Sequence, residues 1–147
     1  MSIAERTAET IWEGSLNAGK GAITGHSGAL GELPVTWAAR TERPGGKTSP
    51  EELAAAAHSS CYSMALSLCL GEHKLTPQKL TVSSTVTLDA VDGVPTVVSS
   101  ALTVKAIVPG LEDSDFQAII DQASALCPIS RLFAGTTITV DATLVTE

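Results

Sequence analysis

The sequence has few aromatic residues, few cysteines and no excess of basic charge. Aromatic side chains make up 3% of its 147 residues, so its core must be built mainly from Val, Leu, Ile and Ala, whose small side chains let elements approach closely. Sixteen acidic against nine basic residues leave a formal net charge of -7. Because phosphate backbones and anionic membranes repel such a chain on average, we expect neither a nucleic acid nor a membrane as its partner.

Three cysteines are too few, and too unevenly placed, for the disulfide framework of a small secreted protein. The first 13 residues include charged side chains, whereas a secretion signal needs an apolar run there. We therefore expect a cytoplasmic protein. The sequence has no internal repeat and no low-complexity linker, so it predicts a single domain over residues 1–147 that folds without a structural metal.

One stretch, Leu53–Gly71, lacks formal charge and is as long as a membrane span. It contains four serines and a histidine among many alanines, so we interpret it as a buried central helix. Ser49 is the expected N-cap of this helix, Pro50 its first residue and Glu52 the partner in a capping box, and Gly71 is expected to end it. Because the helix is small or apolar on all sides, most of its surface should be covered.

Alternating or glycine-bounded segments predict strands on both sides of this helix. The expected strands span 10–13, 22–24, 34–40, 80–88, 98–108 and 138–144, with a turn over 89–95 that joins the fourth and fifth into an antiparallel hairpin. An apolar stripe from Phe116 to Cys127 predicts a second helix, capped by Asp113 or Ser114. Together, these expected strands and helices indicate an α+β domain.

Cys61 and Cys127 occupy different local settings. Cys61 lies in the middle of the long helix, whereas Cys127 directly precedes Pro128 and is expected at a helix end or break. A thiol reacts as a thiolate, and a mid-helix thiol would need a cation from elsewhere to favour that form. Arg40 and Arg43 are the nearest candidates in the sequence. Taken alone, either cysteine is more often an inert part of the core.

Other residues near Cys61 allow further interpretations. Cys69 lies eight positions along the same helix, roughly 12 Å away, which is too far for a disulfide, so we assign it a structural role. His58 shares the helix face of Cys61 and could serve in acyl transfer or as half of a metal site. Neither function is favoured, because no third group is recognisable and His26 and His73 lack ligand-like spacing. We expect a packed, hydrogen-bonded His58 and no metal.

The segment from Ser49 to Leu66, together with Cys127-Pro128-Ile129-Ser130, closely resembles the OsmC/Ohr family of thiol-dependent hydroperoxide reductases. The segments Trp12–Leu16, Gly19–Gly21 and Val108–Leu111 resemble its osmotically inducible OsmC branch. The resemblance implies an intertwined homodimer, with antiparallel sheets packed around the long central helix and a second helix. It implies no cofactor.

The resemblance further implies a peroxidase that reduces organic hydroperoxides, with hydrogen peroxide as a further candidate. Cys61 would be the peroxidatic thiol. Cys127 would resolve the oxidised Cys61 into a reversible intramolecular disulfide, which a dithiol, such as a lipoyl protein, would reduce. The rival interpretation is a non-catalytic thiol redox sensor or a binding protein.

Two charged residues complete the site that the resemblance implies. Arg40 would stabilise the thiolate and orient the peroxide, with Arg43 as the second candidate because the loop differs slightly from that of relatives. Glu51 would partner the arginine. It lies ten residues before Cys61, about 15 Å of helical rise, so we expect the partner subunit to supply it. An acidic residue in a first helical turn also suits the helix dipole, whatever its role.

Overall fold

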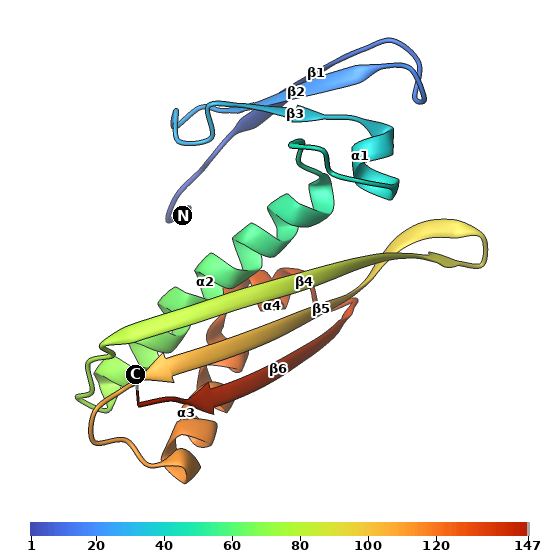
Figure 1. Cartoon of the computed structure of the whole chain (residues 1–147). Helices are drawn as coiled ribbons and strands as arrows, with labels where there is room; N and C mark the ends of the chain where they lie inside the picture. The colour runs from blue at the N-terminus through green and yellow to red at the C-terminus, as the bar shows by residue number, and fades with distance from the viewer. Residues whose placement is uncertain (147) are drawn as a thin grey trace. The chain divides into compact units, whose positions relative to one another are not determined.

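The computed structural model describes residues 1–146, which divide into one unit over Met1–Leu53 and a second that begins at Ala54. The first unit contains an antiparallel sheet with strand order β1-β2-β3. Its elements are β1 (Ala8–Glu13), β2 (Lys20–Gly25), β3 (Glu32–Val35) and α1 (Trp37–Thr41), drawn in blue to cyan in Figure 1.

The expected strand over 34–40 is wrong beyond Val35, because the chain turns into α1. The hydroxyl of Thr36 accepts a hydrogen bond from the backbone N–H of Ala39 over 3.1 Å. Thr36 therefore caps a helix, although β-branched residues are common in strands. This helix carries Arg40.

The long helix α2 (Pro50–Glu72) begins in the first unit and continues into the second. The Ser49 hydroxyl accepts a hydrogen bond from the N–H of Glu52 over 3.1 Å, which confirms Ser49 as N-cap. The Glu52 carboxylate does not complete the expected capping box but accepts a hydrogen bond of 2.6 Å from the Thr48 hydroxyl. The helix ends one residue beyond Gly71.

The second unit contains a sheet with strand order β4-β5-β6. Its strands are β4 (Lys79–Val91), β5 (Val94–Ile107) and β6 (Thr137–Leu144). The first two form the predicted antiparallel hairpin, but β6 runs parallel to β5, so this sheet is mixed rather than antiparallel throughout. The connection allows this parallel pair, because the two helices between β5 and β6 return the chain to the end of the sheet at which β5 begins.

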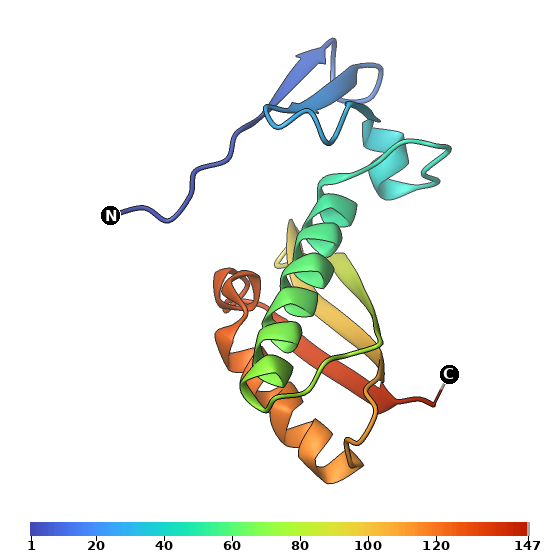
Figure 2. The same ribbon diagram turned by 90° about the vertical axis from the view of Figure 1, so that its left-hand side faces the viewer.

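These two helices are α3 (Asp113–Leu126) and α4 (Pro128–Leu132). The N-cap of α3 is Glu112, so the expected cap at Asp113 or Ser114 is wrong by one or two residues. Cys127 separates the helices in an extended conformation, which confirms the break predicted from the following proline. Within the second unit, α2 and α3 lie side by side on one face of the sheet (Figures 1 and 2).

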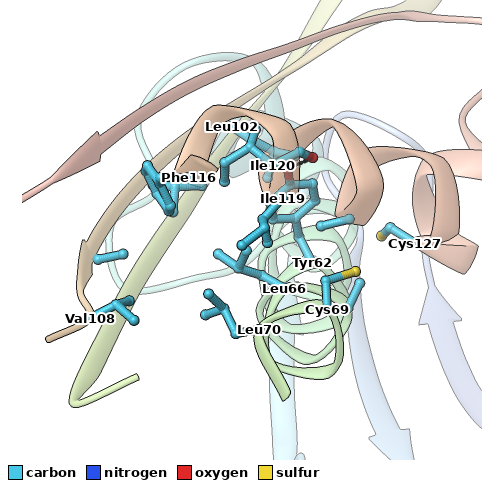
Figure 3. Packing of buried hydrophobic residues seen from close by; sticks show 14 residues of the cluster. Tyr62, Leu66, Cys69, Leu70, Leu102, Val108, Phe116, Ile119, Ile120 and Cys127 are labelled. Carbon is cyan, nitrogen blue, oxygen red and sulfur yellow. Dashed lines mark hydrogen bonds between the residues drawn. The ribbon is translucent and has the colours of Figure 1, made fainter. Parts of the chain in front are cut away.

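The core of the second unit lies between these helices and the sheet (Figure 3). Its largest buried side chains are Tyr62, Leu66 and Leu70 of α2, Phe116, Ile119 and Ile120 of α3, and Leu102 and Val104 of β5. The cluster also contains Cys69 and Cys127. Few of these side chains are aromatic, as the composition predicts.

The expected cover over most of α2 is not provided by a single chain. By length and composition α2 could cross a membrane, and 28% of its most apolar window is buried. One face of the helix enters the core, which identifies it as a core helix. On the other face, Met64 is 72% exposed and Leu68 is 58% exposed.

Candidate functional site

The first unit holds Arg40 and Glu51 as an ion pair. The Nη2 of Arg40 donates a hydrogen bond to Oε1 of Glu51 over 2.6 Å, and Nε of Arg40 lies 3.1 Å from both carboxylate oxygens. The guanidinium carbon also lies 5.9 Å from the centre of the Trp37 ring. Hydrogen bonds from two nitrogens to one carboxylate fix the plane of the guanidinium, and its position over the Trp37 ring restrains the guanidinium further. Arg43 is exposed on the following loop.

The second unit places Cys127 at the start of α4, with its side chain fully buried. The sulfur accepts a hydrogen bond from the backbone N–H of Ser130 over 3.5 Å, so Cys127 serves as the N-cap of this short helix. Figure 3 shows Cys127 at one end of the core cluster, beyond the Tyr62 ring. The sequence had predicted a helix end or break at this cysteine.

Cys61 lies on α2 against the same cluster and is partly exposed. Burial is the main cause that raises the pKa of its thiol, and hydrogen bonding and charge at the neighbouring Cys127 raise this pKa further. A hydrogen bond from the backbone of Ile129 acts in the opposite direction. Cys61 packs against the cluster that contains Cys127, and Cys127 lies close enough to affect its pKa, although 66 positions separate the two cysteines in the sequence. Both are free thiols.

His58 is fully buried one turn before Cys61 and bonds to two serines. Its Nδ1 lies 2.6 Å from Oγ of Ser100 on β5, and its Nε2 lies 2.7 Å from Oγ of Ser130 on α4. The Ser100 hydroxyl is bonded in turn to that of Ser84 over 2.8 Å. Burial lowers the pKa of His58, so the ring is neutral at neutral pH. This is the packed, hydrogen-bonded histidine expected from the sequence.

The structure thus joins the four predicted site residues in two pairs, Arg40 with Glu51 and Cys61 with Cys127. Ser100 and Ser130 were missed, because isolated serines carry no spacing signal. Cys69 is fully buried and burial raises the pKa of its thiol, which suits the structural role assigned to it. Within residues 1–146, no three His, Cys, Asp or Glu side chains gather as metal ligands would.

Comparison with known sequences gives one family. A family model described as OsmC-like protein matches residues 43–142. The peroxiredoxin OsmC of Escherichia coli K12 is 42% identical over 127 residues, which cover 86% of this chain and 88% of the relative. The organic hydroperoxide resistance protein of Xanthomonas axonopodis pv. citri is 29% identical over 101 residues, covering 68% of this chain and 67% of the relative.

Solved structures with the same fold carry similar names. An OsmC-like protein from Mycoplasma pneumoniae matches with a TM-score of 0.76 at 17% identity, over 98% of this chain and 99% of the other. The organic hydroperoxide resistance protein OhrB of Bacillus subtilis matches with a TM-score of 0.72 at 23% identity, over 95% and 98%. At these identities the likeness establishes the fold, which is the one expected from the sequence.

Proposed function

The chain belongs to the OsmC-like protein family, and from this membership we propose a thiol-dependent peroxidase that reduces organic hydroperoxides to alcohols. The observation that carries the proposal is the adjacency of Cys61 and Cys127 in the second unit. Two neighbouring thiols can store and release two electrons as one disulfide without a cofactor. The family match crosses from the first unit into the second, which supports treating residues 1–147 as one functional domain.

In the proposed first step, the thiolate of Cys61 attacks the distal oxygen of the hydroperoxide. The O–O bond breaks as the S–O bond forms, so that Cys61 becomes a sulfenic acid and an alkoxide leaves. The alkoxide takes up a proton from water and departs as the alcohol, which balances the proton that the thiol released when it formed the thiolate. Cys61 lies against an apolar cluster, and such surroundings favour a substrate with an alkyl tail over hydrogen peroxide.

In the second step, the sulfur of Cys127 attacks the sulfur of the sulfenic acid. The S–O bond breaks, the thiol proton leaves with the hydroxide as water, and the two cysteines remain as a disulfide. An external dithiol, such as a lipoyl group on a protein, then reduces this disulfide and is itself oxidised. A reducing cytoplasm is the compartment we propose for this cycle.

We assign the activation of Cys61 to Arg40, held by Glu51. The ion pair supports Arg40 over the exposed Arg43, because a guanidinium fixed in one plane can hold both a thiolate and a peroxide oxygen. The ion pair also means that Arg40 and Glu51 act together in whichever site they serve. Glu51 precedes Cys61 by ten helical residues, so we propose that the pair serves Cys61 of the partner in a homodimer.

Turnover distinguishes this enzyme from the redox sensor that the sequence left as its rival. We expect the protein to consume an alkyl hydroperoxide repeatedly when a dithiol is supplied, and Cys61→Ser to abolish consumption. Cys127→Ser should still oxidise once but should cycle at least tenfold more slowly with a dithiol. Consumption of a single equivalent by the wild type, however much dithiol is present, would identify a sensor instead.

A further inference from the structure

The catalytic proposal gives no role to His58, a titratable group whose side chain is fully buried. Its two ring nitrogens reach in different directions, to Ser100 on the central strand of the sheet and to Ser130 on α4. A neutral imidazole has one donor and one acceptor, and a hydroxyl can play either part, so both bonds can be satisfied at once. His58 therefore connects three elements of the second unit through one ring.

The bond to Ser130 leads directly to Cys127. The same serine that binds His58 through its hydroxyl donates its backbone N–H to the sulfur of Cys127. The ring of His58 also meets Phe133 edge-on, with centres 5.1 Å apart, at the other end of α4. His58 thus contacts this short helix at two points, one of which lies next to the resolving thiol.

A second anchor holds the other side of Cys127. The hydroxyl of Tyr62, the residue after Cys61, donates to the carbonyl oxygen of Ile120 over 3.0 Å and is bonded to Ser124 over 3.0 Å. Both partners lie in the last two turns of α3, just before Cys127. The helix that carries Cys61 is therefore hydrogen-bonded to the chain on both sides of Cys127, through Tyr62 before it and His58 after it.

We propose that His58 is a positioning residue that holds Ser130, and through it Cys127, in place to attack the oxidised Cys61. The inference rests on the proposed function and assigns to this histidine the second chemical step alone. A thiol held next to its target reacts as though at high local concentration, whereas one on a loosely held helix must first return to that position. His58 takes no proton and touches no substrate in this role.

The matched pair His58→Gln and His58→Asn tests this directly. The side-chain amide of Gln reaches the position of Nε2 and can keep the bond to Ser130, whereas that of Asn reaches the position of Nδ1 and can keep the bond to Ser100. Each variant loses one of the two hydrogen bonds of His58 and leaves the hydroxyl of one serine without that partner. We expect His58→Asn and Ser130→Ala to form the disulfide about tenfold more slowly, and His58→Gln to stay within about threefold of wild type.

The readout is a single turnover with an alkyl hydroperoxide, in which trapping reports the sulfenic acid and a mass decrease reports the disulfide. Formation of the sulfenic acid should be equal in all variants, whereas its lifetime should lengthen in His58→Asn and Ser130→Ala. Ser84→Ala is the control, because it removes the outer bond of the same network and leaves both bonds of His58 intact. It should behave as wild type.

A measurement without peroxide separates this inference from the proposed function. In a glutathione redox buffer, the equilibrium between the two thiols and their disulfide reports how well Cys127 is held against Cys61. We expect that constant to fall about tenfold in His58→Asn, which raises the reduction potential by about 30 mV. Equal constants and equal sulfenic acid lifetimes in all variants would overturn the positioning role and leave the peroxidase intact. Shifted constants in a protein that consumes no hydroperoxide would support the positioning role and overturn the peroxidase.

Discussion

The pKa of the Cys61 thiol is raised above its ordinary value, which opposes the thiolate form that the proposed reaction needs. Burial and the neighbouring Cys127 raise its pKa, and the hydrogen bond from the backbone of Ile129 does not offset them. Left to these groups, the thiol would be protonated at neutral pH, and a protonated thiol is a poor nucleophile. A reactive Cys61 therefore needs a cation, and a guanidinium is suited to supply it because it stays charged when partly buried.

Replacing Arg40 tests which cation does this. We expect Arg40→Gln to raise the pKa of Cys61, so that a smaller fraction is thiolate at neutral pH and the reaction with peroxide rises only at higher pH. Each unit by which this pKa rises should slow the reaction at neutral pH about tenfold. The pH dependence of alkylation of Cys61 by iodoacetamide, in a Cys127→Ser background, measures the pKa. The exposed Arg43 offers the matched control, and an effect of Arg43→Gln with none of Arg40→Gln would reverse the assignment.

The sequence predicts some of these residues and not others for a physical reason. Cys61 lies in the helix that a recognisable helix start opens, and Cys127 directly precedes the proline that breaks the next helix, so a single stretch of sequence reveals each setting. The serines that hold His58 lie 42 and 72 residues away, and the fold alone brings them to the ring. Local motifs and the family resemblance they carry therefore single out the proposed reacting groups, whereas the groups that position them need the tertiary structure.

The same division holds for the elements, as the hairpin of β4 and β5 illustrates. The sequence predicted a turn over 89–95, because Asp, Gly and Pro in that segment usually interrupt strands. Both strands continue to Val91 and Val94, and only Asp92 and Gly93 form the turn. Their φ angles of 50° and 77° are those of a two-residue turn whose twist matches the strands. The alternation of apolar and polar residues made the strands predictable. The shortness of the turn depends on two residues, Asp92 and Gly93, in the left-handed backbone conformation.

A glycine substitution tests this turn. Gly93→Ala places a side chain in the left-handed region, so we expect a loss of about 1–2 kcal/mol in the free energy of unfolding, measured with urea. Gly135→Ala is the matched control, because its added methyl would meet no atom within 4 Å and its φ is not positive. It should change stability by less than about 0.5 kcal/mol. Equal losses in both variants would mean that the turn is not where the strain arises.

At the scale of the whole molecule, the exposed face of α2 and the ion pair in the first unit point to the same assembly. A helix with Met64 and Leu68 exposed has an apolar face that a second copy can cover. Arg40 is tied to Glu51, which lies about 15 Å of helical rise before Cys61. In a homodimer that shares its sites, both features are explained, since each chain would give its cysteines to one site and its ion pair to the other.

Mixing two impaired variants tests this sharing without any knowledge of the interface. Arg40→Gln keeps Cys61, and Cys61→Ser keeps Arg40, so a mixed dimer would contain one complete site if the partner supplies the arginine. After subunit exchange at equal concentrations, half of the dimers are mixed, and we expect peroxidase activity of about a quarter of wild type from two preparations that are nearly inactive alone. The control mixes Arg40→Gln with the double variant Arg40→Gln/Cys61→Ser, which should regain nothing. If native mass spectrometry detects mixed dimers and activity does not return, Arg40 serves the cysteine of its own chain.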